Sequence, residues 1–428
     1  MAGTNRYGAA GMTDASDPRP PMPSDPLYAG GTGAIVAGTA VAALSVYLVQ
    51  VIAGRSLGAA GFAPLGIILT AQFLIFTVLY IPVEQYVTRQ LVLSGREWAA
   101  DRHTVATPLV IGVAIGVLFV VATSDRFFEG TLAFAAVLAA LLASRAVASV
   151  ARGHLAGARR FRTYGVMLGA EAALAVALSA LVALTHPTPL TFAAVLPIAP
   201  LAILLARPFS ITVDVRAGSS GVRAGPAFLW ALVGATAASQ IILASGPVVV
   251  GLVGGSAAVV SIVFVTFSLF RGPVTSSYGL IARVLPDFTA IAAAGEQHRL
   301  SRWGRWIGLA GAAAALLFGV LGWVLGRAVI EFLYGPGFVP SSEVAALAAA
   351  AVGFALASLF LNQIYVARGE TGRLAAIWWG ALLVGIFALL VFPGEPAERV
   401  AVSFLIGEAT AMVLLVVAGS FLGARSVD

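Results

Sequence analysis

The sequence predicts an all-α polytopic membrane protein with about twelve transmembrane helices, and three observations lead to this fold class. Hydrophobic residues make up 60% of the 428 residues and charged residues only 10%, whereas a soluble globular domain has roughly 25% charged residues. From Gly30 onward, apolar runs of about 18 to 25 residues recur, which is the length of a membrane-spanning helix. Arginines gather in every second break between these runs. We therefore expect no folded domain outside the membrane.

The apolar runs form two sets of six. The first set covers residues 31–53, 63–88, 105–123, 130–150, 164–184 and 190–207, and the second covers 227–252, 257–282, 305–327, 343–366, 374–392 and 399–421. The longest central break separates the sets, so we expect six-helix lobes at 30–207 and 227–422, joined by a cytoplasmic linker at 208–226. A polar, proline-containing tail at 1–29, expected to be disordered and cytoplasmic, and a short cytoplasmic tail at 423–428 complete the chain.

The arginines predict the orientation, because short loops rich in arginine remain in the cytoplasm. All 25 basic residues are arginine. With the N-terminus inside, nineteen of them fall on the cytoplasmic side, four fall on the outer side (Arg55, Arg126, Arg327 and Arg399), and Arg145 and Arg271 lie within spans. We therefore expect a multi-pass protein of the cytoplasmic membrane with both termini inside. The bilayer explains the basic charge, and no nucleic-acid partner is expected.

The residues for catalysis or metal binding are scarce. The chain has no cysteine, which excludes disulfides and thiolate metal sites. Its four histidines lie in different loops without metal-ligand spacing, and no nucleophile–base constellation or phosphate-binding glycine loop is present. The sequence therefore predicts a protein that is not an enzyme and that needs no metal or other cofactor.

Ionisable residues inside the spans are the candidate functional groups, because each costs at least about 2.5 to 3.5 kcal/mol in the bilayer unless it faces protein or water. Arg145 and Glu171 lie twelve residues before and fourteen after Gly157, in the loop between the fourth and fifth spans. In an antiparallel helix pair these positions have nearly equal depth. We therefore expect a structural ion pair between them.

Arg271 lies inside the eighth span, followed by Gly272 and Pro273, which loosen the backbone. No acid shares its span. An arginine in this position can face an aqueous cavity and bind an anion, because its planar fork matches phosphate oxygens. The alternative is an ion pair with Glu84 or Glu408.

Other polar residues in the spans have two interpretations. Glu84 follows Pro82 and is a candidate proton or cation site, or a partner for an arginine at the inner mouth of the cavity. Gln50, Gln72 and Gln240 are candidate cavity or coupling residues, or they form hydrogen bonds between helices. Glu408, in the last span, has no assigned role.

Four stretches resemble, in order and spacing, motifs of the polysaccharide-biosynthesis flippases of the multidrug/oligosaccharidyl-lipid/polysaccharide exporter superfamily. Arg55–Phe62 resembles the signature R-x-LG-x-x-x-(F/Y), and RGHLAGARRF from Arg152 is similar to RG-x-L-x-G-x-x-RF. IARVLPDFTAIAAAGEQHRL from Ile281 resembles the family's LP-x-x-x-x-x-x-x-x-G element. YGPGF at Tyr334–Phe338 is similar to the segment before its tenth span.

The resemblance implies a MATE-like architecture, in which two six-helix lobes alternate between inward-open and outward-open forms around a central cavity. It implies transport of a polyprenyl-pyrophosphate-linked saccharide for cell-surface polysaccharide biosynthesis, with cell-envelope glycosyltransferases or a polymerase as partners. In that family, arginines of the first, second and eighth spans are assigned to the pyrophosphate. Arg55 and Arg271 occupy comparable places, and the role is carried over to these two alone.

A multidrug or other small-molecule exporter of the same superfamily is the alternative function. Drug and cation antiporters of this superfamily usually carry an acidic residue in the first span. The first span here, residues 31–53, has none. This departure favours the anionic substrate.

The arginine count predicts the topology at each loop. Reporter domains fused after Gly130, Pro187 or Pro393 are expected to report the outer side, and fusions after Gly157 or Ser219 the cytoplasmic side. Activity of paired phosphatase and fluorescent-protein reporters measures this. A single reversed loop would contradict the assignment of the spans.

Overall fold

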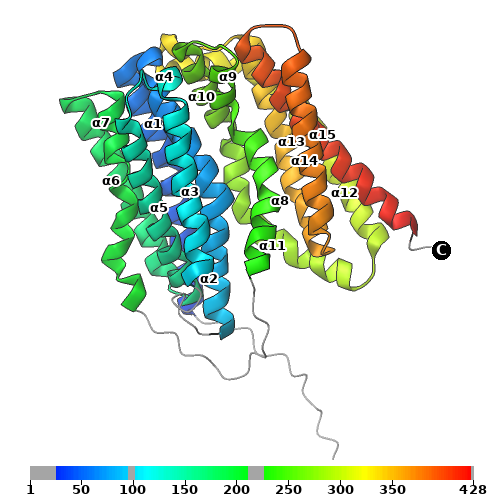
Figure 1. Cartoon of the computed structure of the whole chain (residues 1–428). Coiled ribbons are helices and arrows are strands. Elements are labelled where there is room, and N and C mark those ends of the chain that lie inside the picture. The colour runs from blue at the N-terminus through cyan, green and yellow to red at the C-terminus, as the bar shows by residue number, and fades with distance from the viewer. Residues whose placement is uncertain (1–25, 95–101, 211–225, 426–428) are drawn as a thin grey trace, which may run out of the picture.

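The computed structural model describes residues 26–94, 102–210 and 226–425, and these residues are almost entirely helical (Figure 1). The first half of the chain forms α1 (Pro26–Ile75), the π-helix η1 (Phe76–Tyr80), α2 (Ile81–Ser94), α3 (Arg102–Ala122), α4 (Ser124–Phe127), α5 (Ala133–Gly157), α6 (Phe161–Thr185), α7 (Pro189–Val195) and the 3-10 helices η3 (Ala199–Ala206) and η4 (Pro208–Ser210). The second half forms α8 (Pro226–Ala244), α9 (Gly246–Leu252), α10 (Ala257–Phe270), α11 (Gly272–Ala293), α12 (Gln297–Tyr334), the 3-10 helix η5 (Pro336–Phe338), α13 (Ser342–Ala367), α14 (Thr371–Val391) and α15 (Pro396–Arg425).

The helices match the predicted spans, so the predicted fold class is confirmed. Within the described residues, ten segments are long and apolar enough to cross a membrane. One of them, Ala37–Leu91, has 55 residues, and about 20 residues suffice for one crossing. It therefore contains the first two predicted spans. The seventh predicted span corresponds to α8 and α9, which are not among the ten.

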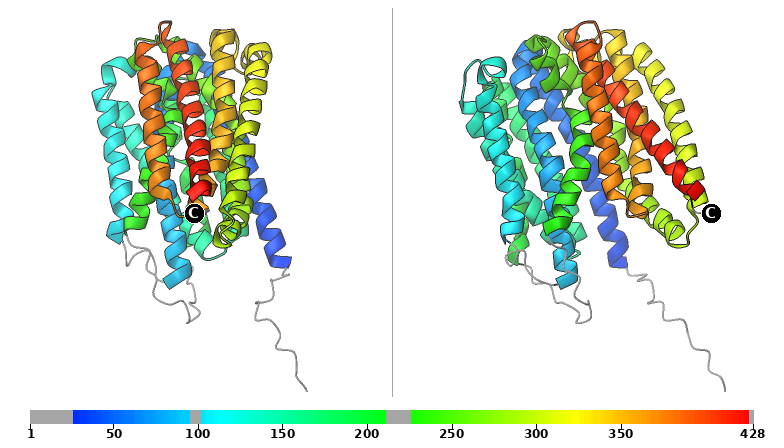
Figure 2. Two further views of the ribbon diagram at one scale, coloured as in Figure 1. Left: turned by 90° about the vertical axis from the view of Figure 1, so that its right-hand side faces the viewer. Right: turned by 45° about the vertical axis from the view of Figure 1, so that its right-hand side comes forward.

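The junction of the first two spans lies where the sequence predicts it, between residues 53 and 63. The chain turns there at Gly58, whose φ of +65° lies in the left-handed region that favours glycine. In Figure 2, α1 begins and α2 ends at the same end of the bundle. Gly58 thus divides α1 into a first arm and a second arm. Most of the predicted tail and linker lies outside the described residues.

Each half of the chain packs mainly on itself, as Figure 1 shows. In the first half α1 contacts α6, and α5 contacts both α2 and α3. In the second half α13 contacts α12 and α15, while α14 contacts α8 and α15. The main contact between the halves is made by α1 and α10. The exact lobe boundaries stay a prediction.

Small residues allow the helices to approach closely. A Cβ atom at Gly353 of α13 would lie 2.3 Å from the backbone nitrogen of Ala315 in α12, and one at Gly38 of α1 would lie 2.2 Å from the carbonyl oxygen of Gly165 in α6. Helices in a membrane associate through such tight contacts, because lipid provides little hydrophobic driving force between them. The abundant glycine and alanine thus have a packing role here.

The arginines distinguish the two ends of the bundle. The end at which α1, α3, α6, α12 and α14 begin carries most of them, and we call it the arginine-rich end. Arg55, Arg126, Arg327 and Arg399 lie close to the helix ends at the opposite, arginine-poor end. This distribution agrees with the predicted alternation of loops.

Candidate functional site

Arg271 lies at the break between α10 and α11, far from either end of the bundle. Fourteen residues of α10 precede it and 22 residues of α11 follow it. It is the C-cap of the first helix and the N-cap of the second. The Gly-Pro pair that follows is thus accommodated at a helix start, where proline is tolerated.

Aromatic side chains from both arms of α1 lie at the break around Arg271. Its guanidinium carbon lies 4.0 Å from the ring centroid of Phe73 on the second arm, a distance typical of a cation–π contact. The hydroxyl of Tyr47, on the first arm, would lie 2.9 Å from a Cβ atom at Gly272, the residue after Arg271. The Tyr47 hydroxyl also lies 3.2 Å from the carbonyl oxygen of Ser268, to which it donates. Arg271 is therefore held at the contact between the two halves.

The two acids considered as partners for Arg271 have other surroundings. Glu84 accepts a hydrogen bond of 2.8 Å from the hydroxyl of Tyr164. Glu408 lines a small pocket in the second half. The face of the Arg271 guanidinium is covered by the ring of Phe73, and its role in binding an anion stays a prediction.

The predicted contact between Arg145 and Glu171 is present, and a second arginine shares it. Arg145 donates to Oε1 of Glu171, and Arg152 donates to Oε2 of the same carboxylate. The sequence places Arg152 in a cytoplasmic loop, which is wrong, because it lies in α5 and is buried. The spacing of Arg145 and Arg152 could have indicated that both contact Glu171. They are seven residues apart, which is nearly two helical turns and keeps them on one face.

Two further groups of the first half belong to the surroundings of this cluster. The ring centroid of Phe76 of η1 lies 5.8 Å from the guanidinium carbon of Arg145 and 6.0 Å from that of Arg152. Glu84 of α2 accepts from Tyr164 of α6, the helix that also carries Glu171. Short π-helical segments such as η1 occur frequently at functional sites, but the structural role of the cluster stays a prediction.

The predicted glutamines occupy three different environments. Gln50 is buried and its Oε1 accepts a hydrogen bond of 3.4 Å from Tyr334 of α12, which links the two halves. Gln72 is half-buried on the second arm of α1, beside Phe73 in the sequence. Gln240 lines the pocket of Glu408. The structure therefore does not bring the three together.

The pocket of Glu408 was not predicted from the sequence. It has a volume of about 30 Å³, enough for one water molecule. The Glu408 side chain is 1% exposed, and within the described residues its Oε2 has no hydrogen-bond partner. Nearby, Trp378 donates to the amide oxygen of Asn362 over 3.1 Å. Five helices contribute to the lining, so no local pattern in the sequence indicates it.

Two arginines at the arginine-poor end connect the halves. Arg55 donates through Nε to the carbonyl oxygen of Leu333 over 2.7 Å and through Nη2 to that of Phe332, in the last turn of α12. Arg126 donates to the carbonyl oxygens of Gly251, over 2.8 and 2.6 Å, and Gly255, over 2.8 Å. The last carbonyls of a helix have no partner within it and bind arginine well.

The position of Arg55 bears on its predicted role. It is exposed, and in this conformation its guanidinium is bonded to α12 rather than placed beside Arg271. Its role in binding substrate stays a prediction. Sequence reasoning missed the contact because Arg55 and α12 are separated by more than 270 residues.

Comparisons with known proteins show the fold. No protein-family model and no curated protein matches the chain. A multidrug resistance MATE family transporter of the MOP superfamily in an inward-facing conformation matches with a TM-score of 0.67 and 12% identity, over 92% of this chain and 98% of that one. An outward-facing structure of a multidrug resistance MATE family transporter matches with a TM-score of 0.55 and 13% identity, over 94% of this chain and 95% of that one.

A third similar structure is a MOP superfamily transporter from Pyrococcus furiosus, described by the reverse polarity of its binding pocket. It matches with a TM-score of 0.60 and 12% identity, over 94% of this chain and 96% of that one. The chain thus has the fold of MATE transporters over nearly its whole length. At this identity the likeness concerns the fold alone.

The shared carboxylate predicts an order of stability for the cluster. Glu171→Ala leaves Arg145 and Arg152 without their common partner and is expected to lower the free energy of unfolding by about 3 to 5 kcal/mol. Arg145→Ala is expected to cost less, because Arg152 remains bonded to Glu171. Heating the purified protein and measuring the folded fraction by size-exclusion chromatography tests this.

The matched control is Arg373→Ala, which removes the 3.7 Å surface pair with Glu370 and is expected to cost at most about 1 kcal/mol. Equal losses for Glu171→Ala and Arg145→Ala would contradict the sharing of Glu171.

Proposed function

We propose that this protein is a membrane transporter that moves an anionic, lipid-linked saccharide, bound through its polyprenyl pyrophosphate, by alternating access. The observation that carries the proposal is the position of Arg271. Arg145 and Arg152 share the carboxylate of Glu171 within the first half. Arg271 lies instead at the contact between the halves, stacked on Phe73.

Stacking and anion binding use different parts of a guanidinium. The aromatic ring covers a face of the group, whereas phosphate oxygens bind the N–H donors at its edge. Phe73 can therefore stabilise the charge of Arg271 in an apolar environment without competing with a phosphate. The hydroxyls of Tyr47 and Thr275 donate to the backbone carbonyls of Ser268 and Gly272, so the guanidinium of Arg271 supplies the donors for a pyrophosphate.

The alternative function is a multidrug or other small-molecule exporter with the same fold, and one observation favours it. Glu408 is a buried carboxylate in a pocket with amide oxygens, which suits a proton or small cation more than an anion. The same group is equally compatible with ion coupling in a flippase. Partnership with cell-envelope glycosyltransferases or a polymerase stays a prediction.

Alternating access requires that the halves separate at one end at a time. Arg55 and Arg126 connect the halves at the arginine-poor end, and the higher TM-score with the inward-facing structure supports closure there. We infer that these two arginines stabilise the inward-open form.

Replacing both arginines is expected to favour the outward-open form. A hydrogen bond to a charged group contributes about 1.5 to 3 kcal/mol. The double variant Arg55→Gln with Arg126→Gln is therefore expected to shift the equilibrium between the inward-open and outward-open forms at least about tenfold toward the outward-open form. Because the chain has no cysteine, Thr275→Cys provides a single labelling site beside Arg271. Its labelling from the arginine-poor side of oriented proteoliposomes is expected to accelerate.

Arg399→Gln is the matched control, because Arg399 bonds to Leu389 within the second half and its loss leaves the halves connected. Unchanged labelling in the double variant would contradict the connecting role. A raised KM for transport in Arg55→Gln, without a change in labelling, would instead support the predicted contact with substrate.

Substitution of Arg271 tests the site directly. Arg271→Ala is expected to abolish transport of a polyprenyl-pyrophosphate saccharide in proteoliposomes while folded protein stays near normal. Arg271→Lys is expected to restore only part of the activity, because an ammonium keeps the charge but lacks the planar fork. Full transport by well-folded Arg271→Ala would contradict the proposal. Loss of transport in Glu408→Gln together with that result would favour the exporter.

A further inference from the structure

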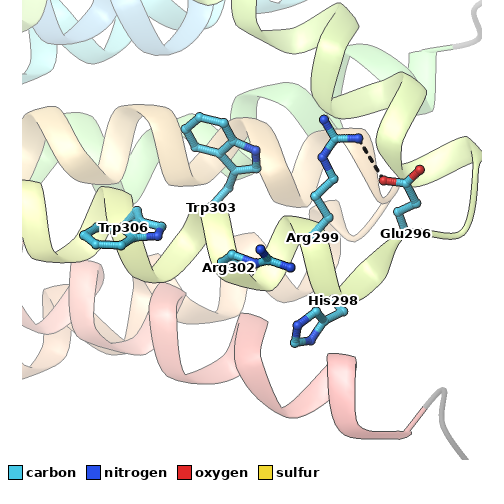
Figure 3. Close-up of a pocket in the computed structure, with 6 residues that line it drawn as sticks. All are labelled: Glu296, His298, Arg299, Arg302, Trp303 and Trp306. Carbon is cyan, nitrogen blue, oxygen red and sulfur yellow. Dashed lines mark hydrogen bonds and ion pairs between the residues drawn. The ribbon is translucent and has the colours of Figure 1, made fainter.

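A hollow lined by arginine and tryptophan lies at the start of α12, at the arginine-rich end and away from Arg271. Its volume is about 610 Å³. Figure 3 shows the six side chains that line it, all from one stretch of α12 and the turn before it: Glu296, His298, Arg299, Arg302, Trp303 and Trp306. Nothing in the proposed transport cycle uses these residues.

Most side chains of the hollow contribute little to packing, because another face of α12 holds the helix in place. Within the described residues only Trp303 among them has a ring contact, its ring centroid lying 6.5 Å from that of Phe288. Ser301 donates to the carbonyl oxygen of Gly419 in α15 over 2.9 Å. A Cβ atom at Gly308 would lie 2.7 Å from a methyl carbon of Val416. Trp306, by contrast, is 64% exposed. The hollow is therefore a free surface of the protein.

The charge of the hollow is positive. Arg299 is paired with Glu296 over 2.9 Å, so their charges cancel. Arg302 and Arg305 are exposed, and neither forms an ion pair in the part of the chain that the structure describes. Tryptophans beside arginines are typical of the membrane–water interface. The unbalanced cations thus lie where lipid headgroups are found.

An apolar groove continues from the hollow along the same face of α12. Arg302, Leu309, Leu316 and Trp323 follow at intervals of seven residues, nearly two turns, and so form one stripe. Leu309 and Leu316 are 62% and 73% exposed. The groove has a volume of about 520 Å³ and only apolar lining residues, from α12, α13 and α15.

The lengths fit one phospholipid. Ten residues separate Arg302 from Ala312, the first lining residue of the groove, which is about 15 Å along a helix. A leaflet has a hydrocarbon depth of about 15 Å. A headgroup beside Arg302 thus places its acyl chain along Leu309, and the end of the chain reaches the start of the groove.

We propose that this surface, the hollow with its groove, binds an anionic phospholipid of the bilayer. The phosphate and the acidic headgroup contact Arg302 and Arg305, and an acyl chain lies along Leu309 and Leu316. A zwitterionic lipid binds more weakly, because its ammonium group faces the same two arginines. The proposal is independent of the proposed function.

The test compares lipid binding to the full-length protein by native mass spectrometry. Phosphatidylglycerol is expected to form a more persistent adduct than phosphatidylcholine. Each arginine near the surface contributes about 1 kcal/mol to anionic-lipid binding, so Arg302→Gln with Arg305→Gln is expected to weaken phosphatidylglycerol binding about 25-fold. The matched control is Arg160→Gln with Arg162→Gln, an exposed pair at the same end, which is expected to leave the adduct unchanged.

A phosphatidylglycerol with a photoreactive acyl chain locates the site. Labelling is expected in the peptides that contain Leu309, Leu316 and Ala350, and is expected to disappear in the Arg302–Arg305 double variant. Equal binding of the two phospholipids, equal loss in both double variants, or labelling elsewhere would overturn the proposal. Displacement of phosphatidylglycerol by stoichiometric polyprenyl pyrophosphate would also overturn it, since the hollow would then belong to the substrate.

Discussion

The cost of an unbalanced charge in hydrocarbon determines the arrangement of this protein's polar groups. With 60% hydrophobic residues, the chain has few polar side chains, and each charged group inside a span needs a partner. The structure provides partners of three kinds. Glu171 binds two arginines, the ring of Phe73 covers Arg271, and backbone carbonyls at helix ends accept from Arg55 and Arg126.

These partners have different consequences, because a carboxylate cancels a charge and a ring or a carbonyl does not. The arginines bonded to Glu171 have little attraction left for a mobile anion. The ring of Phe73 stabilises the charge of Arg271 through its quadrupole and covers only a face of the guanidinium. The N–H donors at the edge of the group are not used by that contact.

The sequence was sufficient for the helices and for contacts within one hairpin. Apolar length predicted the spans, and the equal depth of Arg145 and Glu171 predicted their contact. The break between the first two spans was predicted at residues 54–62, and the chain turns there at Gly58. Contacts between distant segments, such as that of Arg55 with α12 or the pocket of Glu408, could not be predicted, because no periodicity relates those segments.

Polar contacts within one half of the chain differ from those that join the two halves. The cluster of Arg145, Arg152 and Glu171 lies entirely within the first half, so a relative motion of the halves leaves its bonds intact. The contacts of Arg55, Arg126 and Arg271 join one half to the other, so a relative motion of the halves changes them. Under the proposed alternating access, a polar contact that crosses between the halves changes its free energy with the transport state, whereas a contact within a half does not. In a chain with so few charges, the contacts that cross are then the ones through which a bound ligand can bias such a motion.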